Sequence, residues 1–71
     1  MSTMGVMHIG KTLRAKRTER FMTREELAKF VGISRDHLGR IERNEHEPHF
    51  STIKKIADRL DVDPSELVDE E

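Results

Sequence analysis

Apolar residues recur along the chain with the three- and four-residue spacing of amphipathic helices, and no segment alternates like a strand. Ile9 and Leu13 lie one turn apart and predict a first helix over about residues 8–18. Three further apolar stripes predict the second, third and fourth helices, with members at positions 27, 28 and 31, at 38 and 41, and at 53, 56, 57 and 60. The pattern therefore predicts an all-α fold, a compact domain of four to five helices.

The second and third predicted helices have complete start and stop signals. Thr23 is suited to the N-cap of the second helix, and Glu26, three residues later, can complete a capping box. Gly32 can end that helix in the left-handed conformation, and Ser34 can cap the third helix directly afterwards. Asn44 is the next residue that tolerates a positive φ, so the third helix is expected to end there. Two short helices joined by a tight glycine turn describe a central helix-turn-helix.

The sequence predicts a short fifth helix at the end of the domain and short segments outside the domain at both ends of the chain. Asp63, followed by Pro64 and Glu66, is a start signal for a short fifth helix. We expect residues 1–7 to form a flexible arm, residues 8–68 the folded domain and residues 69–71 an acidic tail. The predicted core consists of Leu27, Leu38, Ile41, Ile53, Ile56 and Leu60.

Composition narrows the class of protein. With 71 residues, of which 34% are hydrophobic, the chain can bury one small aliphatic core. It contains no cysteine, which excludes disulfides and thiolate metal sites and suits a reducing compartment. No apolar run reaches the length of a membrane span, and the first ten residues do not form a signal peptide. These features favour a cytoplasmic protein.

The net charge of −1 hides an uneven distribution along the chain. Residues 1–44 carry ten Lys/Arg and five Asp/Glu, a net charge of +5. Residues 45–71 carry three Lys/Arg and nine Asp/Glu, a net charge of −6. This distribution of charge is typical of a protein with a basic face that binds an anionic partner. An ordinary solvated surface could have the same distribution.

The third predicted helix separates apolar from charged residues. At 100° per residue, Ser34, Leu38 and Ile41 share its inner face. Arginine is the side chain best suited to guanine O6 and N7 and to phosphate oxygens, so the composition of the opposite face points to DNA. That face collects Asp36, Gly39, Arg40 and Arg43, with Arg35 at its edge.

Eleven positions around the glycine turn resemble the Xre / lambda-repressor-like family of bacterial and phage DNA-binding domains. They are Thr23, Glu26, Leu27, Ala28, Gly32, Ile33, Ser34, Leu38, Ile41, Glu42 and Pro48. The resemblance covers about residues 8–68, nearly the whole chain. It implies that residues 34–43 form a recognition helix that enters the major groove of double-stranded DNA.

The resemblance also assigns roles to residues. Base contacts are expected from Arg35, Asp36 and Arg40, with His37 and Gly39 as their neighbours. Phosphate contacts are expected from Thr23, Arg24 and Ser34 and, at the end of the recognition helix, from Arg43 and Asn44. Arg17 and Glu42 match a structural ion pair between the first and third helices.

Three features depart from the family pattern. In the loop after the recognition helix, Asn44, Glu45 and Glu47 replace the usual glycine and basic residues, which argues against a phosphate contact there. Arg24 replaces the glutamine that commonly opens the second helix, which should strengthen phosphate binding. Asp36 could accept from cytosine N4, but a carboxylate also repels phosphate. We hypothesise that Asp36 pairs with Arg40, four residues on, and orients it.

Other kinds of chemistry receive little support. The chain has no nucleophile with a matching base and no phosphate-cradling glycine loop, so we expect no enzyme, no cofactor and no small-molecule ligand. His46 and His49 suggest a metal site only weakly, because Pro48 breaks the helical spacing and no third ligand is evident. Gly39 has no side chain and could therefore let the helix approach DNA closely, or it could be an ordinary surface glycine.

The sequence predicts a sequence-specific DNA-binding transcriptional regulator, and a repressor in particular because repression needs only occupancy of the operator. A weak homodimer on a two-fold symmetric operator is expected, since one recognition helix reads few base pairs. The alternative is a protein-binding helical module, antitoxin-like or a regulatory partner, that uses the acidic second half. The self-contact is expected around Ile53, Leu60, Val62, Leu67 and Val68.

Overall fold

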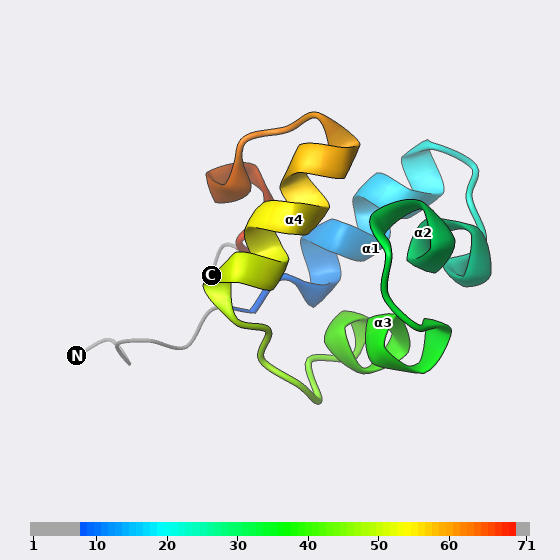
Figure 1. Cartoon of the computed structure of the whole chain (residues 1–71), viewed down its shortest axis with the longest axis horizontal. Helices are drawn as coiled ribbons and strands as arrows, with labels where there is room; N and C mark the ends of the chain where they lie inside the picture. Colours follow the sequence, from blue (N-terminus) through cyan, green and yellow to red (C-terminus); the bar gives the residue numbers. More distant parts are fainter. Residues whose placement is uncertain (1–7, 70–71) are drawn as a thin grey trace.

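The computed structural model describes residues 8–69, and this range forms four α-helices and one short 3-10 helix (Figure 1). The predicted all-α fold is confirmed, and the described range contains no strand. The predicted arm, residues 1–7, and residues 70 and 71 of the tail lie outside the described residues. The elements are α1 (Gly10–Glu19), α2 (Arg24–Val31), α3 (Arg35–Glu42), α4 (Phe50–Leu60) and η1 (Pro64–Leu67).

The predicted capping residues define both helices of the helix-turn-helix. Thr23 Oγ1 accepts from the Glu26 N–H at 3.0 Å, and the Glu26 carboxylate accepts from the Thr23 N–H at 2.8 Å. Gly32 ends α2 with φ 83°, in the left-handed region that favours glycine. Ser34 Oγ then accepts from the His37 N–H at 3.0 Å and starts α3. Each of these predictions is confirmed because the signals act within a few residues.

The N-terminus of α1 lies two residues after the predicted start, and its caps come from distant parts of the chain. The helix starts at Gly10, and Ile9 before it makes no side-chain cap. Asn44 Oδ1 accepts from the Gly10 N–H at 3.2 Å. The Asp69 carboxylate accepts from the N–H groups of Lys11 and Thr12, at 3.2 and 2.8 Å. Asp69, predicted to lie in an acidic tail, therefore belongs to the fold.

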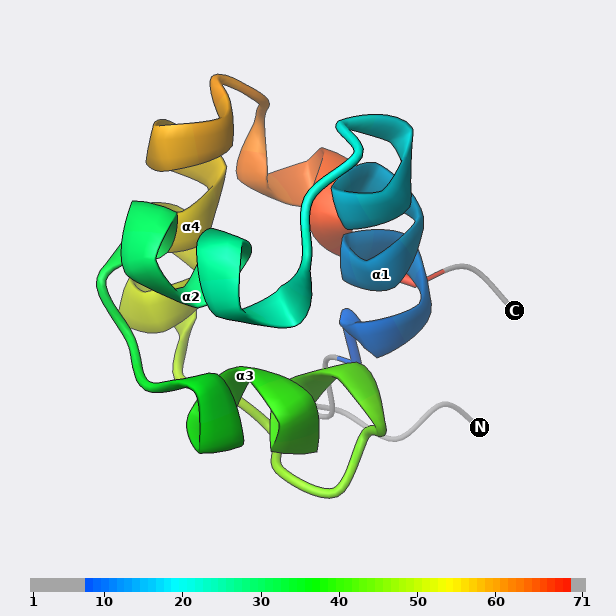
Figure 2. The ribbon, with the colours of Figure 1, turned by 90° about the vertical axis from the view of Figure 1, so that its right-hand side faces the viewer.

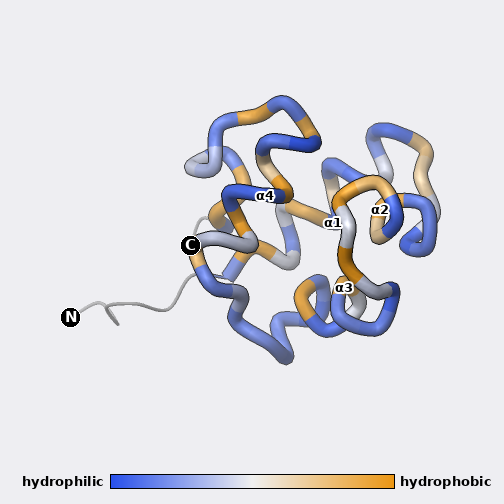
Figure 3. The backbone as a smooth tube through the Cα atoms, in the orientation of Figure 1, coloured by the Kyte–Doolittle hydropathy of each residue, from blue (hydrophilic) through white to orange (hydrophobic). Residues whose placement is uncertain are grey.

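The core is aliphatic, as predicted, and apolar positions alternate with polar ones along each helix (Figure 3). All six predicted core residues are buried, together with Ile9, Leu13, Ala28, Val31, Ala57 and Leu67. Ile53, Leu60 and Leu67 are at most 1% exposed, so these members of the predicted self-contact serve the core of a single copy. Their burial is required because so small a chain has few other residues with which to build its core. All three phenylalanines, in contrast, are exposed: Phe21, Phe30 and Phe50.

Packing places α3 along one edge of the molecule, below α1 and α2 in the view of Figure 2. Helix α2 packs on α3 and α4, while α1 packs on α3 and η1. Gly10 lets α1 approach the C-terminal end of α3 closely, because a Cβ there would lie 2.5 Å from the Ile41 carbonyl oxygen. None of the helices within residues 8–69 is long and apolar enough to span a membrane.

Candidate nucleic-acid interface

Helix α3 presents a charged face on the outside of the molecule. Leu38 and Ile41 are completely buried, which fixes the rotation of the helix about its axis. The arginines predicted to contact DNA are consequently directed away from the core and are exposed. Together with Arg24 of α2 they line a polar hollow of about 380 Å³, whose lining residues are Arg24, Arg35, Asp36, Gly39, Arg40 and Arg43.

The predicted ion pair between Arg17 and Glu42 is present and connects α1 to α3. Arg17 Nε donates to Glu42 Oε2 at 2.7 Å, and Arg17 Nη2 donates to Oε1 at 3.3 Å. The two side chains are only 12% and 3% exposed. Arg17 Nη1 also donates to the Met22 carbonyl at 3.0 Å, so the same guanidinium holds the segment that leads into α2. This pair sets the position of α3 relative to the two helices above it.

Arg24 takes part in the same network, which the sequence did not predict. Its Nε lies 3.5 Å from Glu42 Oε1, although its side chain remains 45% exposed. Because Glu42 belongs to α3, this contact directs the Arg24 side chain over α3 and toward Gly39. Arg24 thus has one polar contact inside the protein and other N–H groups that face solvent.

The side chains predicted to bind phosphate differ in how far they are already occupied. Thr23 and Ser34 each accept a capping hydrogen bond, and each hydroxyl keeps its own proton to donate. Asn44 has φ 58° and uses its Oδ1 to accept from Gly10, so its position serves the fold. Arg43 pairs with Glu45, Nε to Oε2, at 2.9 Å.

The pair between Arg43 and Glu45 is exposed and shifts the pKa of both groups. The side-chain hydrogen bond raises the pKa of Arg43 and lowers the pKa of Glu45. Asp36 adds a smaller electrostatic contribution that also raises the pKa of Arg43. A phosphate at this position would compete with the Glu45 carboxylate for the same guanidinium.

The pairing expected between Asp36 and Arg40 is wrong. Within the described residues, no basic nitrogen lies within the 4.0 Å limit of an ion pair with Asp36. An exposed pair four residues apart contributes only about 0.2–0.5 kcal/mol, too little to hold two side chains together. Both groups are therefore open to solvent on the outer face of α3.

His37 lies at the edge of this face and contacts the loop after α3. Its ring centroid is 5.0 Å from that of His46, in an edge-to-face arrangement. Partial burial lowers the pKa of His37, and the charges of His46 and Arg40 lower it further. Residues 8–69 contain no group of three or more His, Cys, Asp or Glu placed to hold a metal ion.

Three comparisons relate this arrangement to known proteins. The model of the helix-turn-helix family matches residues 13–67. The immunity repressor protein of Bacillus phage phi105 is 37% identical over 65 residues, which cover 92% of this chain and 45% of the repressor. The chain thus spans less than half the length of that relative.

Two examples of solved structures with this fold are similar to most of the chain. The restriction-modification controller protein C.AhdI from Aeromonas hydrophila has a TM-score of 0.79 and 34% identity, over 87% of this chain and 94% of its own. SinR, a master regulator for biofilm formation solved in complex with DNA, has a TM-score of 0.76 and 32% identity, over 83% and 95%.

Proposed function

Because the chain belongs to the helix-turn-helix family, we propose that it binds double-stranded DNA sequence-specifically as a transcriptional repressor. In this proposal α3 enters the major groove, and the protein acts in the cytoplasm. The observation that carries it is the arginine face of α3, held outward by the buried Leu38 and Ile41. The names of similar proteins, an immunity repressor and a regulator in complex with DNA, support it.

The roles of individual side chains follow from their places on α2 and α3. Arg35 and Arg40 lie on the exposed face of α3, where they can donate two parallel hydrogen bonds to guanine O6 and N7. Thr23 and Ser34 lie at helix N-termini, where a hydroxyl and free N–H groups favour a phosphate. Arg24, beside Thr23, adds a positive charge for the same strand of the backbone.

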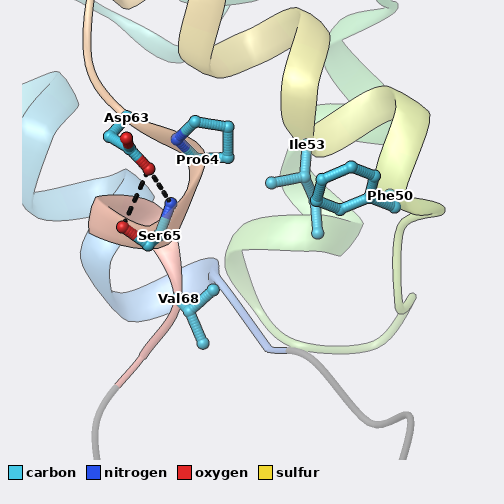
Figure 4. A pocket seen from close by; sticks show the side chains of 6 residues that line it. All are labelled: Phe50, Ile53, Asp63, Pro64, Ser65 and Val68. Carbon is cyan, nitrogen blue, oxygen red and sulfur yellow. Dashed lines mark hydrogen bonds between the residues drawn. The ribbon is translucent and has the colours of Figure 1, made fainter.

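A homodimer on a two-fold symmetric operator is the form in which this function is proposed. Helix α3 has eight residues, about 12 Å, so one copy reads only a few base pairs. An apolar hollow of about 350 Å³ lies between the start of α4 and η1 (Figure 4). Phe50 and Ile53 face Pro64 and Val68 across it, and Phe50 is 56% exposed. We propose that this hollow, which shares Ile53 and Val68 with the self-contact expected from the sequence, receives a second copy.

A charged variant tests that self-contact. Phe50 is the first residue of α4, where an aspartate suits the positive end of the helix dipole, so Phe50→Asp should fold. It should bind a single half-site like the wild type and lose the cooperative binding of two half-sites. Phe21→Asp is the matched control, because Phe21 is 93% exposed and does not line the hollow. Equal cooperativity in Phe50→Asp and wild type would contradict this interface.

The proposed function itself is tested by selecting bound duplexes from a random library. We expect a common site with an inverted repeat, bound with an affinity that falls steeply as salt increases, because phosphate contacts release counterions. If no sequence is enriched, or if binding is weak and does not depend on salt concentration, the result would favour the alternative of a protein-binding module.

A further inference from the structure

The hollow on the outer face of α3 has a glycine as its floor. A Cβ built at Gly39 would lie 3.2 Å from Arg43 Nη1 and 3.6 Å from Arg24 Cδ. These two side chains therefore converge above Gly39, on the side of the helix that faces away from the core. Gly39 itself is buried beneath them, whereas Arg40 beside it is exposed.

The fold does not require a glycine at this position. Gly39 lies inside α3 with no positive φ, so any L-residue could adopt its backbone conformation. The atoms that a Cβ would meet are the flexible parts of two arginine side chains, which can move. Glycine is nevertheless the least favourable residue after proline in a helix interior. The missing side chain leaves space on the floor of the hollow, beneath the movable side chains of Arg24 and Arg43.

The groups around the hollow match one kind of base pair. Arginine side chains offer paired N–H donors, which suit the adjacent acceptors O6 and N7 of guanine. The unpaired carboxylate of Asp36 offers an acceptor for the N4 amino group of cytosine. None of the six lining residues carries an aliphatic or aromatic side chain of the kind that best suits the methyl group of thymine.

We propose that Gly39 is a specificity-determining residue, whose missing side chain admits the major-groove edge of a G·C base pair into the hollow. This inference rests on the proposed DNA-binding function and names the base pair that the site selects. Gly39 acts by leaving space, while Arg40 and Asp36 supply the hydrogen bonds to the two bases.

The test compares wild type with Gly39→Ala on duplexes obtained by selection. The added methyl group should lower affinity for the selected duplex at least about fivefold, since one base contact is lost, and leave a scrambled duplex unaffected. Ser51→Ala is the control for a change to alanine on an exposed helix, because Ser51 is exposed on α4 and does not line the hollow. Each variant is first melted, and Gly39→Ala should be at least as stable as wild type.

Modified bases identify the pair that enters the hollow. Replacing single guanines of the selected duplex by 7-deazaguanine removes the N7 acceptor, and wild type should lose affinity about fivefold at one or two positions per half-site. Gly39→Ala should no longer distinguish guanine from 7-deazaguanine at one of these positions.

Three results would overturn the inference: a Gly39→Ala variant that discriminates like wild type, one that melts at a lower temperature, or a selected site without a sensitive guanine. If wild type selects no duplex at all, the proposed function fails first, and that result is distinct from these three.

Discussion

Replacing Arg17 by methionine should destabilise the domain strongly, because it leaves the Glu42 carboxylate buried without its main partner. Breaking a buried ion pair from one side costs about 3–5 kcal/mol. Here the lower end applies, about 3 kcal/mol, since Arg17 is 12% exposed and Arg24 remains 3.5 Å from Glu42. A domain of 71 residues has a free energy of unfolding of only about 4–11 kcal/mol. The loss should lower Tm by roughly 12–24 °C.

Thermal and urea unfolding followed by circular dichroism measure this effect. The double variant Arg17→Met/Glu42→Leu should recover most of the loss, because two apolar side chains then replace a desolvated pair. Arg43→Met is the control: it breaks a pair whose side chains are 53% and 56% exposed and should leave Tm nearly unchanged. If Arg17→Met were no more destabilising than Arg43→Met, the buried pair would not be what positions α3.

Two further predictions concern packing and pH. Gly10→Ala should cost at least about 2 kcal/mol of unfolding free energy, because its Cβ would meet the carbonyl oxygens of Ile41 and Glu42 at 2.5 and 2.6 Å; an unchanged urea midpoint would rule out that close contact. Since its surroundings lower the pKa of His37 in the folded state, the unfolded state binds more protons. The free energy of unfolding should therefore decrease as the pH falls below 6.5 toward the lower pKa of folded His37. Melting curves recorded from pH 8 to 5 should show a smaller decrease for His37→Gln than for the wild type.

The elements that could be predicted from the sequence are those governed by neighbouring residues. The limits of α2 and α3 depend on Thr23, Gly32 and Ser34, each of which acts within one helical turn. Helical periodicity likewise identified Leu38 and Ile41 as the buried side of α3, and so the face that carries the arginines. The resemblance to a known family supplied the pair between the first and third helices.

The features that escaped prediction depend on contacts between distant parts of the chain. Asp69 caps α1 from 57 and 58 residues away, and nothing in its local sequence distinguishes it from a solvated tail. Gly10 is needed only because α3 ends against it. Asp36 and Arg40 have suitable spacing for a pair, yet solvent competes for both charges, so spacing alone predicted a contact that the structure lacks.

Affinity of Arg40→Ala and Arg24→Ala for a selected and a scrambled duplex, measured at several salt concentrations, tests the central claim that α3 reads bases. Arg40→Ala should lose about 1–3 kcal/mol on the selected duplex and little on the scrambled one. Arg24→Ala should weaken both duplexes alike and lower the salt slope by about 1 per protein copy. Both variants must first show the helical spectrum of wild type, since Arg24 also contacts Glu42. If the two variants exchange these signatures, or if Arg40→Ala binds the selected duplex like wild type, α3 is not the helix that reads the major groove.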